Sequence, residues 1–331
     1  MGLPWRVLAT PRSFFEEGRE GYELLRTAGV EVVPSPVDRP LQEEELAGLL
    51  GGFDGLVAGV DRVGRRALLG GRPRLRVVAR NGVGVDNVDV QAATELGIVV
   101  TNAPSVNSDS VADFTFALLL ALVRHVPEAD RALRAGGWPR LVGVELSGKC
   151  LGLLGFGRIG QKVAERARGF GLRVLAYDPQ PDREAARALG VELVEFHTLL
   201  QEADFLSLHL PLLPETRHLL GEAELRRMKR TSYVVNTARG GIVDEAALAR
   251  ALQEGWIAGA ACDVFEEEPP KHSPLLGARN LLLSPHMASH TREAIARASR
   301  VAAENVLAAL RGERPPNAVN PEVFGPPDRR A

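Results

Sequence analysis

The stretch that decides the fold is Lys149–Asp178, which reads KCLGLLGFGRIGQKVAERARGFGLRVLAYD. Its first apolar run, Cys150–Leu154, has the length of a buried strand. The segment Gln161–Phe170 has a helical pattern, and the glycine that follows it is a residue type that commonly ends a helix. A second apolar run, Leu172–Tyr177, completes a strand–helix–strand unit. Such a unit predicts a parallel sheet with its chemistry at the turn between the first strand and the helix.

Three glycines at that turn have G-x-G-x-x-G spacing: Gly155, Gly157 and Gly160. In this arrangement the first glycine allows a tight turn, the second lets a pyrophosphate approach the backbone, and the third lets the helix pack closely on the strand. The start of the helix also presents unpaired N–H groups to phosphates. The spacing alone fits any glycine-rich turn. With a strand before it and a helix after it, it predicts dinucleotide binding.

The acidic residue at the end of the second strand indicates which dinucleotide is bound. Asp178 follows Gly160 by 18 residues, where a carboxylate can accept hydrogen bonds from the two hydroxyls of an adenine ribose. The same charge would repel a 2′-phosphate, and no arginine immediately follows Asp178 to offset that repulsion. The expected cofactor is therefore NAD rather than NADP.

Composition excludes several classes of protein. The 331 residues are 45% hydrophobic and 25% charged with a formal net charge of −2, so nothing favours nucleic acid or an anionic membrane as a partner. The longest apolar run, Phe114–Val123, is well short of the ~18 residues of a membrane span. The start of the chain lacks the long apolar segment of a signal peptide, so a cytoplasmic location is expected. Cys150 and Cys262 lie in apolar runs and are expected to be buried free thiols, and no metal site is expected.

Strands and helices alternate on both sides of the central unit. Short apolar strands are expected between Arg6 and Thr101 and again between Val191 and Leu283, with helical segments between them. This alternation predicts two parallel, doubly wound sheets. The first half has no G-x-G-x-x-G of its own at its first turn, so it is the less suitable half for the nucleotide.

Two long helices and two breaks in the pattern define the expected domain boundaries. The segment Asn102–Pro104 interrupts the alternation, and the helix expected at Val111–Arg124 is apolar nearly all round, so it must be buried. The helix expected at Thr291–Arg311 is too long to serve only the second sheet and should return to the first domain. The proline-rich tail, Pro315–Ala331, is expected to be irregular.

Three expected loops, each following a strand of the second sheet, contain the residue types needed for carbonyl chemistry. They contribute Arg239, the three consecutive acids Glu266–Glu268, and His286. The carboxyl ends of parallel strands meet at one edge of a sheet, so these loops should converge. An arginine can bind a carboxylate through paired hydrogen bonds, and a histidine can supply a proton. Three adjacent acids usually mark a solvated loop, and the pattern does not choose between them.

Taken together, these motifs resemble the NAD-dependent D-2-hydroxyacid dehydrogenases. The resemblance runs over nearly the whole chain and includes, in order, NGVGVDNVD, NAPSVNSDSVAD, LLGFGRIG, HLPL, NTARGGIVDE, AGAACDVFEEEP and SPHMASHT. It implies an α/β fold of two Rossmann-like doubly wound parallel-sheet domains linked by two long helices, with a cleft between them. The discontinuous, flavodoxin-like substrate-binding domain would be 1–104 plus 290–331, and the NAD-binding Rossmann domain 105–289. A homodimer through the NAD-binding domain is also implied.

The resemblance also implies roles for individual residues. The catalytic set would be Arg239, Glu268 and His286, with Glu268 chosen because it directly precedes a proline. The substrate would contact Val83, Gly84, Arg239 and His286, while Arg80 could meet a substrate phosphate or be a surface residue. The expected cofactor-binding residues are Gly155, Gly157, Arg158, Ile159 and Gly160 at the pyrophosphate, Asp178 at the ribose, and Thr237, Ala238, Asp263 and Ser289 near the nicotinamide.

The expected substrate is a small 2-hydroxy or 2-oxo acid. The N-terminal motif and the tail RPPNAVNPEV are most similar to short D-3-phosphoglycerate dehydrogenases, which implies oxidation of 3-phosphoglycerate to 3-phosphohydroxypyruvate, as in serine biosynthesis. One alternative is a glyoxylate or hydroxypyruvate reductase, or another D-2-hydroxyacid dehydrogenase. The other is a non-catalytic NAD-sensing protein of the corepressor type, which the presence of all three catalytic residues disfavours.

Overall fold

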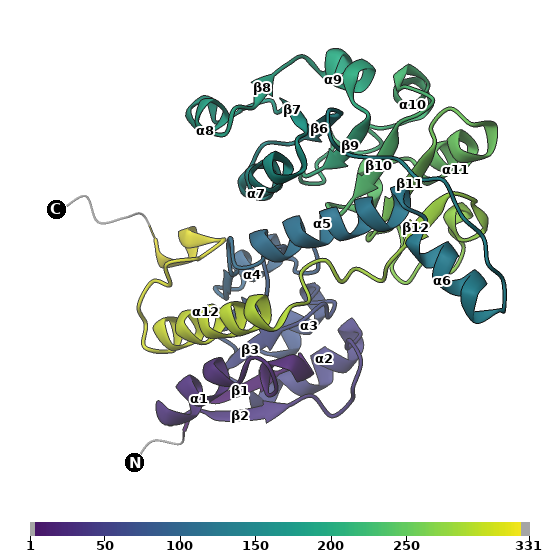
Figure 1. Cartoon of the computed structure of the whole chain (residues 1–331). Helices are drawn as coiled ribbons and strands as arrows, with labels where there is room; N and C mark the ends of the chain where they lie inside the picture. Colours follow the sequence, from purple (N-terminus) through teal and green to yellow (C-terminus); the bar gives the residue numbers. More distant parts are fainter. Residues whose placement is uncertain (1–3, 326–331) are drawn as a thin grey trace. The chain divides into compact units, whose positions relative to one another are not determined.

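The computed structural model describes residues 4–325, and these form two compact units. The terminal unit contains the chain up to Asn107 and the chain from His290 onward. The central unit is Ser108–Ser289. Each unit has its own parallel sheet with helices on both faces (Figure 1). The prediction of two doubly wound α/β units is therefore confirmed.

The sheet of the terminal unit has five parallel strands in the order β2-β1-β3-β4-β5. This is the flavodoxin-like order, in which the chain starts inside the sheet and continues to both sides. The strands are β1 (Arg6–Ala9), β2 (Glu31–Pro34), β3 (Gly55–Ala58), β4 (Val77–Arg80) and β5 (Val99–Thr101).

Helices cover both faces of this sheet. The longest, α12, packs against α1, β3 and β4, and its Ala302, Ala303 and Val306 side chains are fully buried there. Figure 1 shows α12, in yellow-green, beside α1. The helices of the terminal unit are α1 (Arg19–Thr27), α2 (Glu43–Leu49), α3 (Arg65–Gly70), α4 (Val90–Glu95) and α12 (Arg292–Leu310).

The described part of the tail is anchored to the edge of the sheet and ends in a short 3₁₀ helix, Pro321–Phe324. Asn320 is fully buried, and its side-chain oxygen accepts a hydrogen bond from the Val100 N–H at 2.7 Å. Its amide group donates to Thr94 Oγ1 and to the Ile98 carbonyl, each at 3.0 Å. The tail is thus less irregular than its proline content suggests; residues 326–331 lie outside the described part.

The sheet of the central unit has seven parallel strands in the order β12-β11-β10-β9-β6-β7-β8. From β6 the chain first builds outward through β7 and β8, then crosses to β9 and builds the other way. This is the Rossmann order with one additional strand, and its switch point lies between β6 and β9. The strands are β6 (Cys150–Leu154), β7 (Arg173–Tyr177), β8 (Glu192–Leu193), β9 (Phe205–Leu208), β10 (Tyr233–Asn236), β11 (Gly259–Cys262) and β12 (Leu281–Leu283).

Two apolar cores, one on each face of the central sheet, hold its helices. Helices α5 and α7 share one core, in which Phe116 and Val163 are buried, and α9, α10 and α11 share the other. Helix α5 is buried, as its apolar sequence predicts, although it begins earlier than expected, at Ser108. The helices are α5 (Ser108–Val123), α6 (Val126–Arg134), α7 (Arg158–Ala167), α8 (Arg183–Leu189), α9 (Phe196–Glu202), α10 (Glu222–Arg227) and α11 (Glu245–Glu254).

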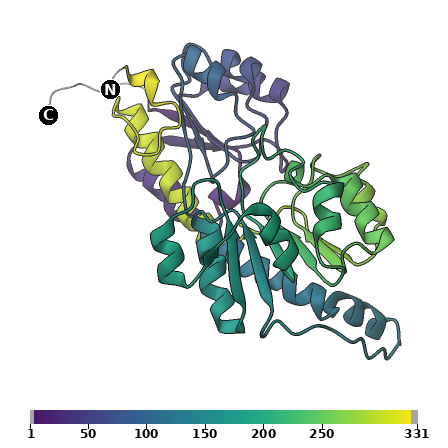
Figure 2. The ribbon, with the colours of Figure 1, turned by 90° about the horizontal axis from the view of Figure 1, so that it is seen from above.

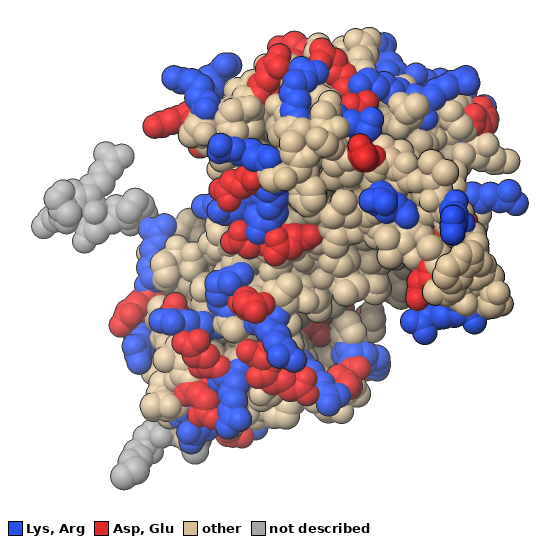
Figure 3. Space-filling view, viewed as in Figure 1, with Lys and Arg blue, Asp and Glu red and all other residues tan. Residues whose placement is uncertain are grey.

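The surface and the thiols agree with the composition. Acidic and basic side chains are interspersed over the face drawn in Figure 3. Within residues 4–325 no single helix has the length and apolarity to cross a membrane; α5 and α6 meet those limits only as a pair, with a bend of 59° between them. Cys150 and Cys262 are buried free thiols, and burial raises the pKa of Cys262 to about 12, so this thiol stays protonated.

The anchoring of the tail can be tested at Asn320. Replacing Asn320 with Ala leaves the Val100 N–H and the Ile98 carbonyl buried without a partner, so the free energy of unfolding should fall by roughly 1–3 kcal/mol. Urea denaturation followed by circular dichroism measures this. Glu322→Ala, which removes an exposed side chain of the same tail, is the control and should leave the unfolding midpoint unchanged. Equal midpoints for all three proteins would contradict the proposed anchor.

Candidate active site

The three glycines of the predicted dinucleotide turn differ in the space around them. Gly155 has a φ of +103°, and a Cβ there would lie 2.7 Å from the carbonyl carbon of His209. A Cβ on Gly160 would lie 2.4 Å from the Gly155 carbonyl oxygen. A Cβ on Gly157 would meet no atom within 4 Å. Packing therefore requires the first and third glycines, whereas the second leaves open space in which a pyrophosphate fits.

The start of α7 completes this cradle. Gly157 is the N-cap of the helix, and the first turn contains the exposed Arg158 and the half-buried Ile159. The first N–H groups of a helix have no partner within the helix, and the helix dipole makes this end partly positive. The first turn contains no acidic side chain, so this partial charge is not neutralised locally. The arrangement suits the phosphates of a dinucleotide.

Asp178 connects the glycine turn to the loop after β7. Its Oδ2 accepts a hydrogen bond from the Phe156 N–H and its Oδ1 from the Gln180 N–H, both at 2.8 Å. The side chain is half-buried, and each carboxylate oxygen has a second lone pair. The residues present therefore fit an adenine ribose, and Asp178 also stabilises the turn that receives the pyrophosphate.

His286 and Glu268 lie in contact at the ends of the two neighbouring strands β12 and β11. The distance from His286 Nδ1 to Glu268 Oε2 is 2.7 Å, and Glu268 Oε1 accepts the Phe265 N–H at 3.1 Å. Of the three consecutive acids, Glu266 instead lies 3.1 Å from His218 Nε2, and Glu267 is exposed. The structure thus brings to His286 the acid that directly precedes the proline.

The protonation of this pair follows from the environment of Glu268. Burial raises the pKa of Glu268. Its hydrogen bond to His286, the charge of His286, the Phe265 N–H and the charge of Arg239 all lower that pKa. Together they outweigh burial, so the pKa of Glu268 lies below its ordinary value. An ionised carboxylate only accepts hydrogen bonds, so Nδ1 of His286 must bear the donated proton. The other ring nitrogen, Nε2, is left to exchange a proton with a substrate.

Arg239 lies on the loop after β10, which is folded by a buried asparagine. Asn236 donates from its amide to the Arg239 carbonyl at 2.9 Å and accepts the Ala238 N–H at 3.0 Å. A Cβ on Gly240 would lie 1.9 Å from the Phe265 carbonyl carbon, so this loop packs directly on the loop that contains Glu268. Arg239 is half-buried, and its charge contributes to the low pKa of Glu268.

Asp263 holds the loop that contains His286. Its carboxylate is fully buried and accepts hydrogen bonds from Ser284 Oγ at 2.6 Å, Met287 N at 2.9 Å and Ala288 N at 2.8 Å. Its carbonyl accepts the His286 N–H at 2.7 Å, in a loop where His286 has a φ of +50°. With three internal donors, Asp263 shapes the loop of His286, and its contact with the carboxamide stays a prediction.

The remaining residues expected near the nicotinamide lie on the same two loops. Thr237 is buried, and its Oγ1 lies 3.1 Å from Thr115 Oγ1 on α5, so its side chain ties the Arg239 loop to that helix. Ala238 and Ser289 are half-buried. Thr237 and Ala238 follow β10, whereas Ser289 ends the loop after β12.

One residue beside the glycine turn has no role in the sequence-based prediction. His209 follows β9 at the switch point, with Nε2 2.9 Å from Ser207 Oγ. Its Nδ1 is buried without a hydrogen-bond partner among the described residues. Burial lowers the pKa of His209 to about 3, so the ring is neutral at physiological pH. The HLPL motif contains this histidine, and its place after a strand at the switch point was the available signal.

The predicted substrate-binding residues Arg80, Val83 and Gly84 belong to the terminal unit, at and after the end of β4. The Arg80 guanidinium lies over Gly82, where a Cβ would be 2.7 Å from Arg80 Nη1. The Val83 carbonyl accepts a hydrogen bond from Asn102 Nδ2 at 2.8 Å. They thus belong to a different unit from Arg239, Glu268 and His286.

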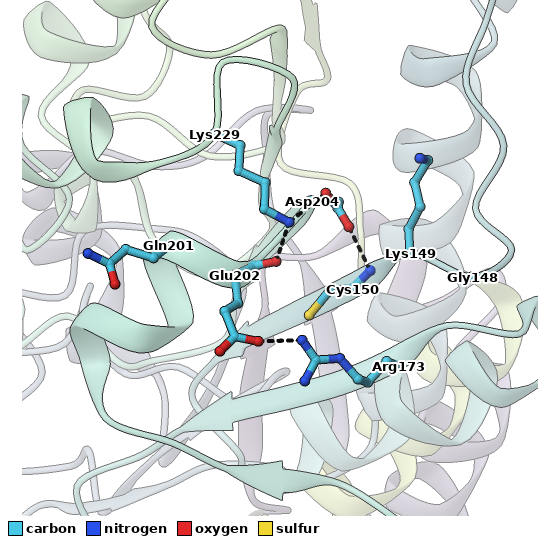
Figure 4. Close-up of a pocket in the computed structure, with 8 residues that line it drawn as sticks. All are labelled: Gly148, Lys149, Cys150, Arg173, Gln201, Glu202, Asp204 and Lys229. Atoms are coloured by element: carbon cyan, nitrogen blue, oxygen red, sulfur yellow. Dashed lines mark hydrogen bonds and ion pairs between the residues drawn. The ribbon is translucent and has the colours of Figure 1, made fainter.

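A cavity of about 270 Å³ in the central unit lies at the opposite end of the strands, near the starts of β6 and β7 (Figure 4). Four of its charged side chains form two pairs: Lys229 Nζ lies 2.8 Å from Asp204 Oδ1, and Arg173 contacts Glu202. Among residues 4–325 no group of three or more His, Cys, Asp or Glu side chains is arranged to hold a metal ion.

The turn, the acid after β7 and the strand order define a dinucleotide-binding α/β protein, and comparisons with known proteins identify its family. The family model of the D-isomer specific 2-hydroxyacid dehydrogenase NAD-binding domain matches residues 116–288. A glyoxylate reductase of Korarchaeum cryptofilum is 52% identical over 258 residues, which cover 76% of this chain and 78% of that protein. The chain belongs to the NAD-dependent D-2-hydroxyacid dehydrogenases.

Two further comparisons bear on substrate and fold. A D-3-phosphoglycerate dehydrogenase of Methanocaldococcus jannaschii is 47% identical over 283 residues, but these cover 85% of this chain and only 54% of that protein. A solved structure of a Thermus thermophilus protein has a TM-score of 0.85 and 40% identity, covering 95% of this chain and 99% of that one. The chain is thus similar to relatives with different substrates.

Asp178 can be tested through cofactor affinity. Asp178→Ala should raise the Kd for NADH roughly tenfold, because the ribose acceptor and two hydrogen bonds of the turn are lost. The preference for NADH over NADPH should narrow in the same variant, since the repulsion of the 2′-phosphate disappears. Fluorescence titration with both cofactors measures this, with Asp182→Ala as a control outside the turn. If the ratio of the Kd for NADPH to the Kd for NADH were the same in Asp178→Ala as in the wild type, the role of Asp178 would be contradicted.

Glu268 can be tested through the pH dependence of turnover. Glu268→Gln keeps the shape of the side chain but removes its charge, so protonated His286 becomes less favourable. The kcat/KM for reduction should then decline at lower pH than in the wild type, while Glu267→Gln keeps the wild-type profile. Because the pKa of Glu268 is lowered, the wild-type pair persists at mildly acidic pH and is lost only as pH falls through that lowered value. A shift of the pH profile in Glu267→Gln alone would show that Glu267, and not Glu268, supports His286.

Proposed function

We propose that this dehydrogenase reduces glyoxylate, or a 2-oxo acid of similar size, to the corresponding 2-hydroxy acid with NADH. The observation on which this proposal rests is the 2.7 Å contact between His286 and Glu268 on loops next to the loop of Arg239. The similarity to glyoxylate reductase over three quarters of both chains supports this substrate class. The proposal replaces our sequence-based preference for 3-phosphoglycerate.

Each of the three residues has a distinct task in the proposed reaction. Arg239 pairs with the substrate carboxylate, which fixes the carbonyl relative to His286. Protonated Nε2 of His286 donates its proton to the carbonyl oxygen as that oxygen gains negative charge, and Glu268 holds the ring through Nδ1 and stabilises its positive form. The bound cofactor supplies the hydride to the carbonyl carbon. In oxidation the same His286 nitrogen begins neutral and accepts the hydroxyl proton.

A second candidate function is the oxidation of 3-phosphoglycerate. Arg80 favours it, because its guanidinium lies over Gly82, next to the backbone expected to bind the substrate. A guanidinium is well suited to a phosphate. The phosphoglycerate dehydrogenase relative is nearly twice as long as its match to this chain. It therefore supports the second candidate less strongly than the glyoxylate reductase supports the first.

A substrate panel distinguishes these two functions. With NADH and equal enzyme, kcat/KM for glyoxylate should exceed that for 3-phosphohydroxypyruvate by roughly tenfold or more, since differences in pocket contacts of 1–3 kcal/mol give such ratios. Hydroxypyruvate and pyruvate complete the panel, and absorbance at the NADH band follows turnover. A higher kcat/KM for the phosphorylated acid would favour the second candidate. Tight NADH binding with no turnover of any acid would instead favour the NAD-sensing alternative.

The active form is further proposed to be a homodimer formed through the central unit. Helix α6 and the segment after it project from the body of that unit (Figure 2). Large apolar side chains are exposed along them, with Trp138 77% and Val142 90% exposed. Exposed apolar side chains gathered in this way favour association. The others are Val126, Leu133 and Leu141.

The assembly can be tested by light scattering after size exclusion. Trp138→Ala combined with Val142→Asp should reduce the molar mass from that of two chains to that of one, because a charge in an apolar interface is unfavourable. Leu276→Asp is the control, since Leu276 is also exposed but lies outside this segment. A wild-type mass of one chain would rule out the dimer.

A further inference from the structure

Glu245 is a buried carboxylate that the proposed reaction does not use. It ends the motif NTARGGIVDE, whose Arg239 belongs to the site, and it is the first residue of α11. Only 7% of Glu245 is exposed. A charged group is costly to bury unless hydrogen bonds satisfy it, so the partners of Glu245 indicate what it does.

The partners of Glu245 lie on the segment that contains Glu268. Glu245 Oε1 accepts the Glu266 N–H at 2.7 Å, and the Glu245 N–H donates to Glu266 Oε1 at 3.3 Å. Glu245 Oε2 accepts the hydroxyl of Ser273. One carboxylate therefore joins both ends of the segment Glu266–Ser273, and Glu268 lies between those ends.

Helix α11 does not need the Glu245 carboxylate as its N-cap. Asp244 is the N-cap of α11, and its side chain accepts the Ala247 N–H at 3.0 Å. The capping role is thus already filled, and the side chain of Glu245 is left for the segment. The positive end of the helix dipole also favours a negative charge in the first turn.

The backbone that Glu245 holds is the backbone that orients Glu268. Glu268 Oε1 accepts the Phe265 N–H at 3.1 Å, directly beside the Glu266 N–H that Glu245 binds. Around the same point, His218 Nε2 lies 3.1 Å from Glu266 Oε1 and Arg217 Nη2 lies 3.9 Å from Glu266 Oε2. Movement of this backbone would change the 2.7 Å contact between Glu268 and His286.

We propose that Glu245 is a positioning residue for the reaction: by holding both ends of Glu266–Ser273, it keeps Glu268 in contact with His286. The inference rests on the proposed function of Glu268 and His286. It differs from a merely structural role because loss of Glu245 should change proton delivery more than it changes folding or cofactor binding. Cofactor binding is expected to be spared because the glycine turn follows a different strand, β6.

The test compares Glu245→Ala, Glu245→Gln and Ser273→Ala in the full chain. Glu245→Ala should lower kcat for glyoxylate by roughly 10- to 100-fold, as expected for a misplaced catalytic group, and move the pH profile in the same direction as Glu268→Gln. The Kd for NADH should stay within about twofold of wild type. Glu245→Gln should recover most activity, because its amide oxygen still accepts the Glu266 N–H. Ser273→Ala should have a smaller effect, since it releases one end only.

The matched control is Asp244→Ala, which removes the cap of the same helix without touching the segment. It should lower Tm while leaving the pH profile at the wild-type position. A wild-type pH profile in Glu245→Ala, or the same profile shift in Asp244→Ala, would overturn the proposal. Hydrogen–deuterium exchange gives a readout independent of turnover: amides 264–275 should exchange faster in Glu245→Ala than in Asp244→Ala. If the wild type reduces none of the acids, the proposed function fails. Equal exchange of these amides in the two variants would separately refute the positioning role of Glu245.

Discussion

The hydrogen bond between His286 and Glu268 depends on the mutual fit of three loops at one edge of the central sheet. The loop after β10 needs Gly240, because any side chain there would collide with the Phe265 backbone. The loop after β12 is shaped by Asp263, whose buried carboxylate accepts three hydrogen bonds from it. Glu268 and His286 are both about two-fifths exposed, so their geometry is set by these buried supports and not by their own packing.

The residues proposed for cofactor binding and those proposed for proton transfer lie at different parts of the same sheet edge. The glycine turn and Asp178 follow β6 and β7, on one side of the switch point, whereas Arg239, Glu268 and His286 follow β10, β11 and β12 on the other. A parallel sheet brings these loops to one edge whatever their distance along the chain. In the proposed reaction, the hydride donor and the proton donor therefore approach one substrate carbonyl from separate parts of the edge.

The sequence predicted those features that depend on local pattern. The glycine turn, Asp178 and the alternation of strands and helices are readable because each is encoded by neighbouring residues. The three acids at Glu266–Glu268 could not be separated by pattern alone, and only the family resemblance favoured Glu268. The supporting roles of Asp263, Glu245 and Asn320 were not predicted, because their partners are brought near by folding. The substrate preference also eluded prediction, since it depends on the shape of a pocket.

The central claim is that an ionised Glu268 holds the proton of His286 on Nδ1 and leaves Nε2 for the substrate. Nitrogen-15 NMR of histidine-labelled protein measures this directly, with the His286 signals assigned from a His286→Asn variant. In the neutral ring, we expect Nδ1 to give the shift of a protonated nitrogen and Nε2 the shift of an unprotonated one, with Nε2 gaining its proton as pH falls. A neutral His286 protonated on Nε2, with an unprotonated Nδ1 facing Glu268, would contradict the account.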